Sequence, residues 1–123
     1  MGLGKVRMST RSQVLLSQLK HKTGLPANVL GRYAICLSLR DSSVPNPDLY
    51  DEGGTELPPH VLYGPLERVF EAIMVDRLRE DGLDPSEYMD RMVRAHLNRG
   101  AAALFSRVGG LGDLCALAGA APR

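Results

Sequence analysis

Cations and small polar side chains cluster around one predicted turn, at residues 22–25 of this 123-residue chain. Lys20 and Lys22 precede or begin the turn, and Asn28 and Arg32 follow it one helical turn apart. Ammonium and guanidinium groups form charge-assisted hydrogen bonds with phosphate oxygens. The helix start after the turn also favours phosphate, because its first N–H groups have no intrahelical partner. With Arg11 and Arg40 at the periphery, the candidate phosphate-binding residues are Lys20, Lys22, Thr23, Asn28 and Arg32.

Charge is distributed unevenly along the chain. Residues 1–40 contain no Asp or Glu, and their cations are Lys5, Arg7, Arg11, Lys20, Lys22, Arg32 and Arg40. This segment therefore carries +7, and the remainder must carry −6, because the formal net charge is +1. A single basic end on a small protein favours a polyanionic partner, nucleic acid first.

A purely structural interpretation competes with DNA binding. Lysines in the last turn of a helix offset the negative end of the helix dipole, which accounts for Lys20 and Lys22. It does not account for forty residues without an acid. On the residues alone, both interpretations stay open.

The arrangement of helix, short turn and helix is similar to that of DNA-reading helix-turn-helix proteins. The second helix is too apolar to read bases, because only Asn28, Arg32, Ser38 and Arg40 could face them. Contacts should therefore go mainly to the DNA backbone. With four to six phosphates neutralised, we expect a log–log salt slope of about −4 to −5.

Two helices must position these residues. The first begins near Thr10, with Ser9 or Thr10 as its cap, and Gly24 suits its C-terminal end. Gln13, Ser17 and Lys20 share one face of this helix, and Lys22 is assigned to the turn. Pro26 suits the first position of the second helix, which is apolar almost all round and is expected to be buried.

The rest of the chain predicts a helical domain with one long loop. Residues 41–65 are rich in Pro, Gly and acidic side chains and form a loop, which could compete with DNA for the basic patch. Residues 66–81 and 84–100 are amphipathic helices, and residues 101–108 either continue the latter or start another. After a Gly-rich break, a short helix completes the chain.

The expected fold is therefore all-α: a compact bundle of about four main helices plus a short C-terminal helix, in a single domain over residues 9–123. Residues 1–8 are a flexible arm or an alternative start, with a short strand as the other option. The apolar stripe of the third main helix comprises Leu66, Val69, Phe70, Ile73, Met74 and Leu78. We expect that stripe to face the core.

Candidates for catalysis are few. Cys36 and Cys115 are isolated, and buried thiols are favoured over a disulfide or a sulphur relay. His96 lies on an apolar helix face, so a hydrogen-bonded core or interface histidine is favoured over a general base. Asn98 and Arg99 are expected to be exposed, with Arg99 extending the basic surface. No nucleophile elbow, zinc-protease motif or paired-cysteine motif occurs, so no metal or cofactor is expected.

The sequence contains no run of 18 apolar residues, and its first residues lack the apolar centre of a signal peptide. The expected location is the cytoplasm.

The segments LKHKTGLPANVLGRYAICLSL and RAHLNRG resemble the DndE family, the small component of the bacterial DNA sulphur-modification (phosphorothioation) machinery. The resemblance runs from about Met8 to Ala118. It implies an all-helical fold, a homo-oligomer that could be a tetramer, and binding of duplex DNA by basic residues with a preference for nicked duplex. It also implies partners among the other proteins of the sulphur-modification complex.

The expected function is thus that of a non-catalytic DNA-binding subunit. Two alternatives remain: an adaptor whose main partner is another protein of the complex, and a DNA nickase that uses His96 and a carboxylate.

Overall fold

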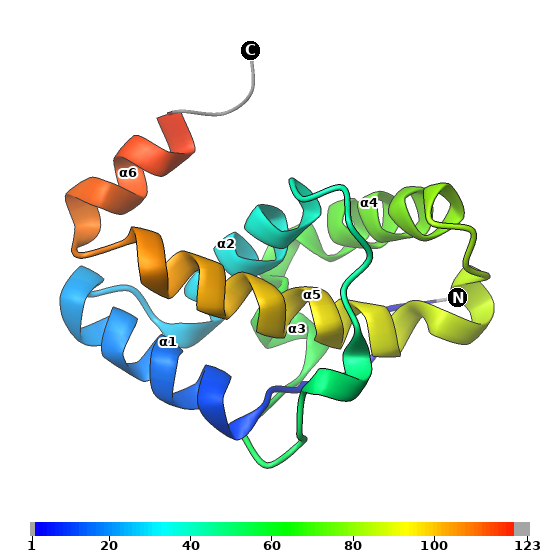
Figure 1. Ribbon diagram of the computed structural model, residues 1–123, viewed down its shortest axis with the longest axis horizontal. Helices are drawn as coiled ribbons and strands as arrows, with labels where there is room; N and C mark the ends of the chain where they lie inside the picture. Colours follow the sequence, from blue (N-terminus) through cyan, green and yellow to red (C-terminus); the bar gives the residue numbers. More distant parts are fainter. Residues whose placement is uncertain (1, 120–123) are drawn as a thin grey trace.

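The computed structural model describes residues 2–119, which form a helical domain with one very small sheet (Figure 1). The larger helices are α1 (Thr10–Thr23), α2 (Ala27–Leu39), α4 (Glu67–Glu80), α5 (Pro85–Arg107) and α6 (Leu111–Gly119). Shorter elements are α3 (Pro59–Leu62), the 3-10 turns η1 (Pro47–Leu49) and η2 (Gly64–Leu66), and strands β1 (Val6–Arg7) and β2 (Glu56–Leu57). The all-α prediction is confirmed, and so is the short N-terminal strand.

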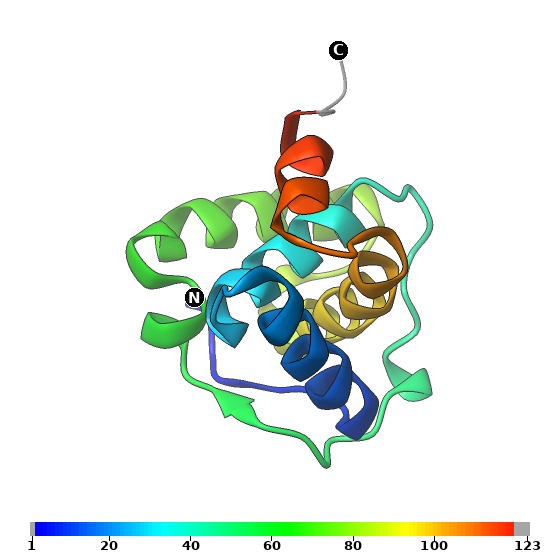
Figure 2. The same cartoon turned by 90° about the vertical axis from the view of Figure 1, so that its left-hand side faces the viewer.

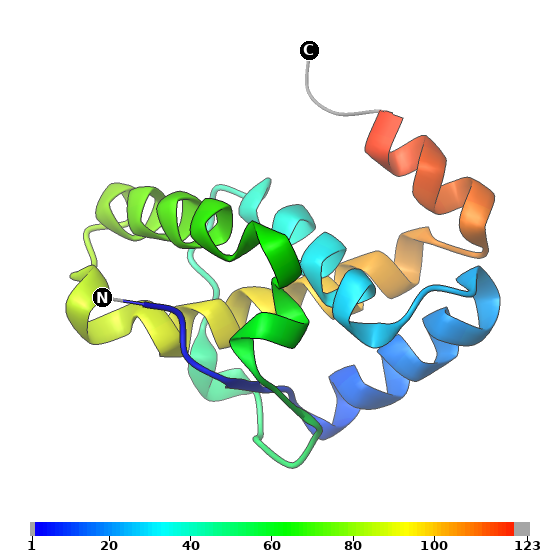
Figure 3. The same cartoon turned by 180° about the vertical axis from the view of Figure 1, so that it is seen from behind.

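Helix α5 is the centre of the fold, with α1, α2 and α4 packed against it (Figures 1 and 3). Its longest contact is with α2, whose Leu30, Ala34 and Ile35 are buried. Gly100 permits this contact, because a Cβ there would lie 1.7 Å from the carbonyl oxygen of Ala34. Helix α5 continues without a break through Gly100 to Arg107. Of the two alternatives for residues 101–108, continuation of the same helix is thus the one observed.

The ends of the helices follow the predicted signals. Ser9 caps α1 by accepting a hydrogen bond from the N–H of Ser12, and Gly24 closes that helix with a positive φ of 77°. Two boundaries differ by one position or more. Helix α1 continues to Thr23, so Lys22 lies in its last turn and not in the loop, and Pro26 precedes the first residue of α2.

The predicted stripe of α4 is only half correct. Phe70, Met74 and Leu78 are buried against the core. The other half of the stripe is exposed: Leu66, Val69 and Ile73 show 43%, 51% and 41% of their surface. The apolar stripe extends farther around the circumference of α4 than the face that packs on α5. In addition, Arg77, paired with Asp81, occupies a buried position on the same face as Phe70 and Met74. An apolar strip is thereby left on the outer side of α4.

Strand β1 pairs antiparallel with β2, with Val6 opposite Leu57. This ladder attaches the N-terminal segment to the long loop. None of the helices within residues 2–119 has the length and apolar content required to cross a membrane.

Candidate nucleic-acid interface on helix α1

Helix α1 lies at the edge of the molecule and buries a single face (Figure 2). Ser12, Leu16, Leu19 and Thr23 form that face, at the three- and four-residue spacing of one helix side. The remaining side chains of α1 are exposed or half-buried. Because α1 contains no acidic residue, its solvent-facing surface is neutral or positive throughout.

One flank of α1 combines a lysine with the start of α2. Gln13, Ser17 and Lys20 line a groove of about 250 Å³ together with Ala27, the first residue of α2. No side chain caps this end of α2, and the N-terminal end of a helix carries partial positive charge. The Lys20 side chain has no hydrogen-bond or ion-pair partner among residues 2–119. This flank therefore offers an ammonium group and a helix dipole to the same anion.

The opposite flank of α1 carries the other two cations. The Lys22 ammonium lies over the Phe105 ring of α5, 4.7 Å from its centroid. Arg11 lines a second groove of about 280 Å³, which it shares with Tyr50 and Asp51. The carboxylate of Asp51 accepts hydrogen bonds from the backbone N–H and hydroxyl of Thr10, and these bonds hold its pKa below the ordinary value. Arg11 therefore faces solvent beside a fixed negative charge.

Lys20 and Lys22 consequently do not meet in one clamp. Residues two positions apart on an α-helix point about 200° apart around its axis. Because Lys22 belongs to the helix, its ammonium turns toward α5 while Lys20 faces the start of α2. The structure places the two cations on opposite sides of an exposed helix.

The other predicted phosphate ligands already have partners inside the protein. The Thr23 hydroxyl donates to the carbonyl of Leu19 at 2.7 Å and accepts from the N–H of Leu25. The Asn28 amide donates to the carbonyl of Val61. Arg32 donates from Nε to the carbonyl of Leu62 at 2.6 Å and from Nη2 to that of Val61.

Arg32 thus binds the carbonyl end of α3, where the helix dipole is negative. Arg40 is exposed and lies at the end of α2, far along the chain from α1. Of the seven predicted DNA-binding residues, the structure places Arg11, Lys20 and Lys22 together around one exposed helix.

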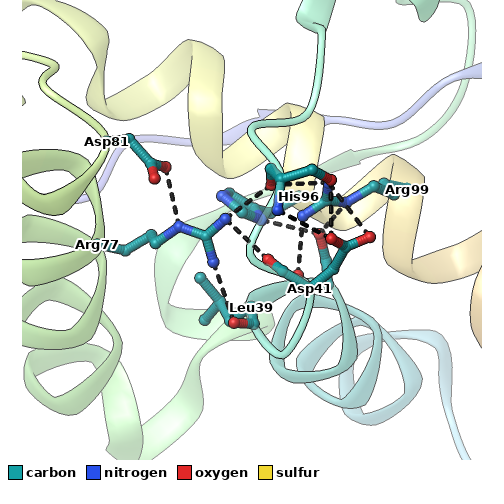
Figure 4. A network of polar contacts seen from close by, with 8 residues as sticks. Leu39, Asp41, Arg77, Asp81, His96 and Arg99 are labelled. Carbon is teal, nitrogen blue, oxygen red and sulfur yellow. Dashed lines mark hydrogen bonds and ion pairs between the residues drawn. The ribbon is translucent and has the colours of Figure 1, made fainter.

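The prediction for Arg99 is wrong, and Arg77 and Arg94, for which no prediction was made, bind backbone carbonyls in the same way. Arg99 was expected to be exposed, but its Nη2 donates to the carbonyl of Ser38, and Nη1 donates to the carbonyl and hydroxyl of Ser43. Arg77 donates to the carbonyls of Leu39, Asp41 and Ser43 (Figure 4). Arg94 binds the next part of the loop, because its guanidinium donates to the carbonyls of Pro47 and Tyr50.

These three arginines fix the loop that follows α2. A segment without regular structure leaves its carbonyl groups in need of donors, and guanidinium groups supply several at once. The sequence therefore contained a signal for the role of these arginines. A long loop rich in Pro and Gly needs donors for its carbonyl groups, and arginines lie on the helices that follow it. Asn98, also expected to be exposed, is buried and accepts a hydrogen bond from the N–H of Ser9.

His96 is a core histidine, as predicted. It is fully buried, and its Nδ1 lies 2.8 Å from the Ser38 hydroxyl oxygen, which also accepts a hydrogen bond from Arg99 (Figure 4). Burial, with Arg77 and Arg99 nearby, lowers the pKa of His96 to about 4. The ring is therefore neutral at pH 7 and is held by its hydrogen bond with the Ser38 hydroxyl. It has no access to a substrate.

The acidic loop pairs with cations other than Lys20 and Lys22. Asp48 lies 3.7 Å from Arg91, Glu52 lies 4.0 Å from Arg94, and Asp41 lies 3.7 Å from Arg99. Glu56 lies near both Lys5 and Arg7, two cations of the basic N-terminal segment, and offsets one of their two charges. Among residues 2–119, the cations of α1, Arg11, Lys20 and Lys22, form no ion pair with this loop.

The prediction of buried thiols is wrong, because Cys36 and Cys115 are both exposed. Partial desolvation nevertheless raises the pKa of Cys36, so its thiol is protonated at pH 7. Within residues 2–119, no three His, Cys, Asp or Glu side chains are grouped closely enough to hold a metal ion.

Both the sequence and the fold of this chain match known proteins. Residues 5–109 match the family model described as DNA sulphur modification protein DndE. The fold is similar to the crystal structure of DndE from Escherichia coli B7A, involved in DNA phosphorothioation modification. That similarity has a TM-score of 0.68 and 24% identity, covering 85% of this chain and 98% of the other.

The crystal structure of a DndE mutant involved in DNA phosphorothioation is similar to the same degree. Its TM-score is 0.67 at 21% identity, over 85% of this chain and 99% of that one. A comparison with curated proteins finds no match.

Proposed function

Because this chain belongs to the DndE family of DNA sulphur modification proteins, we propose that it is the non-catalytic subunit that binds duplex DNA for phosphorothioation. Binding is through the phosphate backbone, with little sequence specificity. The contacts are made mainly by the cations of α1, with Lys20 and Lys22 as the principal residues and Arg11 peripheral; Arg40, at the end of α2, is a further peripheral residue. In this proposal, Thr23, Asn28 and Arg32 support the site from within the fold and do not contact phosphate.

One observation carries the proposal: the exposed surface of α1 has three cations, no carboxylate of its own, and no ion pair with the acidic loop. An internal role would pair such cations, as it does for Arg77, Arg94 and Arg99. Exposed and unpaired cations on one element are the pattern that electrostatic DNA binding requires. A preference for nicked duplex and partners within the modification complex are taken over from the family resemblance.

A catalytic role as a nickase is disfavoured by the position of His96. The imidazole is fully buried and is hydrogen-bonded through Nδ1 to Ser38. A general base must come within hydrogen-bond distance of the proton that it removes. We therefore assign His96 to the core.

We further propose that the protein self-associates through the outer strip of α4. Leu66, the residue that precedes α4, and Val69 and Ile73 on α4 are all at least 41% exposed. Exposed apolar strips of this kind mark surfaces that contact another protein. An oligomer would present several copies of α1 to one duplex, which raises affinity through effective concentration. An adaptor function would use this same strip to bind another protein of the complex.

The test of DNA binding is a gel-shift titration with intact and nicked duplexes of one sequence. The Lys20→Ala/Lys22→Ala protein should bind both duplexes at least about tenfold more weakly than wild type, since two phosphate contacts are lost. The matched control is Arg79→Ala/Arg91→Ala, which removes the same charge from exposed positions away from α1 and should bind within about twofold of wild type. Equal losses in both proteins, or no binding by wild type, would overturn the proposal.

A further inference from the structure

The exposed surface of α1 has a neutral crest between two charged flanks. Val14, Ser17, Gln18 and His21 recur at helical spacing on the side opposite Leu16 and Leu19. Val14 is 50% exposed, and the three polar residues are exposed as well. Lys20 lies on one side of this crest, toward α2, and Lys22 and Arg11 lie on the other, toward α5 and the loop.

From this arrangement we infer that α1 lies in the major groove of duplex DNA, with its crest facing the base edges and its flanking cations contacting the phosphates on both sides. The inference rests on the proposed DNA binding and specifies how the same surface meets the duplex. A helix that only touched one strand from outside would use a single flank. Cations on two opposite flanks fit two rows of phosphates with the helix between them.

The width of an α-helix such as α1 matches the width of the DNA major groove. An α-helix with side chains is about 10–12 Å across, and the major groove of B-DNA is about 12 Å wide. The minor groove, at about 6 Å, is too narrow for a helix. From Arg11 to Lys22 the helix rises about 17 Å, enough to follow several phosphates along each groove wall. Side chains of the crest are short or neutral, so they do not hold the helix away from the base edges.

The acidic groups near α1 set the boundary of the contact. Asp51 lies at the N-terminal end, where it is bonded to Thr10, and it faces the Arg11 flank. The C-terminal half of α1 carries Lys20, His21 and Lys22 and has no acidic side chain of its own. Helix α6 packs against α1, and the carboxylate in its first turn, Asp113, accepts a hydrogen bond from the N–H of Gly109. DNA contact is therefore centred on the C-terminal half of α1, with Arg11 contributing less than either lysine.

The major groove can be blocked without altering the phosphates. In duplexes whose cytosines are replaced by glucosylated 5-hydroxymethylcytosine, sugar groups fill the major groove. We expect wild-type protein to bind this duplex at least tenfold more weakly than the unmodified one. Saturating the unmodified duplex with netropsin, which occupies the minor groove, should change the affinity less than twofold. Full affinity for the glucosylated duplex, or loss of binding with netropsin, would overturn the inference.

A variant pair tests the protein side of the same contact. Val14→Glu places a carboxylate on the crest, and Val44→Glu places one in the loop, where Val44 is 51% exposed and so matches Val14 at 50%. We expect at least a tenfold loss of DNA affinity for Val14→Glu and less than a twofold loss for Val44→Glu. Equal affinities for the two variants would overturn groove insertion.

Backbone binding and groove insertion predict different results in these experiments. If wild type binds plain and glucosylated duplexes equally and loses affinity on Lys20→Ala/Lys22→Ala, backbone binding stands and groove insertion is wrong. If wild type binds neither duplex, the proposed function itself is wrong. Circular dichroism of Val14→Glu and Val44→Glu checks that both variants are folded. The experiments with the glucosylated duplex and with netropsin use wild-type protein and therefore do not depend on the folding of any variant.

Discussion

The arginines of this protein differ in role according to the partner that each side chain finds. Arg32, predicted to bind phosphate, donates to the last carbonyls of α3. Arg99, predicted to extend the basic surface, holds Ser38 and Ser43. The sequence identifies both as cations in the right region, but it cannot show which carbonyls come within reach. Lys20, whose flexible ammonium has no hydrogen-bond or ion-pair partner in the described part of the chain, remains available to a ligand.

Arg32 and Lys20 should therefore have opposite effects on stability and binding. Arg32→Ala leaves two carbonyls without a charged donor and should lower the free energy of unfolding by about 2 kcal/mol, while the salt slope of DNA binding stays unchanged. Lys20→Ala should leave stability within about 0.5 kcal/mol and make the slope shallower by about 1. Urea unfolding and DNA titration at several salt concentrations measure both. A slope change with Arg32→Ala would restore its predicted role as a phosphate ligand.

Neutral, buried His96 makes the stability of the protein depend on pH. The unfolded histidine takes up a proton near its ordinary pKa of 6.5, whereas the folded one does so only near a pKa of about 4. Stability is therefore full above pH 6.5 and falls by about 3 kcal/mol as the pH drops to 4.

His96→Gln, which cannot titrate, should lack this loss between pH 6.5 and 4. The aspartates whose pKa values are lowered, such as Asp41 and Asp51, titrate in both proteins and cancel in the comparison. Parallel stability curves for the two proteins would mean that His96 is accessible to protons in the folded state.

At the scale of the elements, most helix positions follow from local sequence signals. Ser9 and Gly24 mark helix ends that the structure reproduces. The exposed half of the α4 stripe could not be foreseen, because periodicity gives the direction of an apolar face but not how much of it a neighbour covers. The contact of α2 with α5 at Gly100 depends on two segments more than sixty residues apart, so no local pattern reveals it.

Gly100 should therefore be much less tolerant of substitution than other helical glycines. In Gly100→Ala, the new methyl group meets the Ala34 carbonyl oxygen at 1.7 Å, so α2 and α5 must move apart. We expect a loss of about 3 kcal/mol in the free energy of unfolding.

Gly112→Ala in α6 is the matched control for this substitution. A Cβ at Gly112 has no neighbour within 4 Å, and the helix should gain up to about 1 kcal/mol. Thermal or urea unfolding of the two variants distinguishes them, and similar stabilities would contradict the close packing of α2 on α5.

At the scale of the whole molecule, the cationic surface and the exposed apolar strip found within residues 2–119 lie on different helices. The cationic surface is on α1, and the apolar strip is on α4, across the central helix α5 (Figures 1 and 3). Association through α4 therefore leaves α1 open to DNA. The charge of residues 1–40 predicted one of these surfaces, whereas the apolar strip became visible only when the packing was known.

Self-association through α4 can be broken by one charge. Ile73→Glu places a carboxylate in the strip and should shift the protein toward monomer in light scattering at micromolar concentration, because apolar contact is lost and a charge is desolvated. Val44→Glu, at an exposed position away from α4, should keep the mass of wild type. Equal masses for Ile73→Glu and wild type would place any oligomer interface elsewhere.

The claim that exposed cations of α1 hold the DNA backbone is tested most directly by the salt dependence of duplex binding. We predict a linear decrease of log affinity with log salt for wild type, and a slope shallower by about 2 for Lys20→Ala/Lys22→Ala, since each lost phosphate contact contributes about 0.9. A slope near zero for wild type, or identical slopes for the two proteins, would contradict the account.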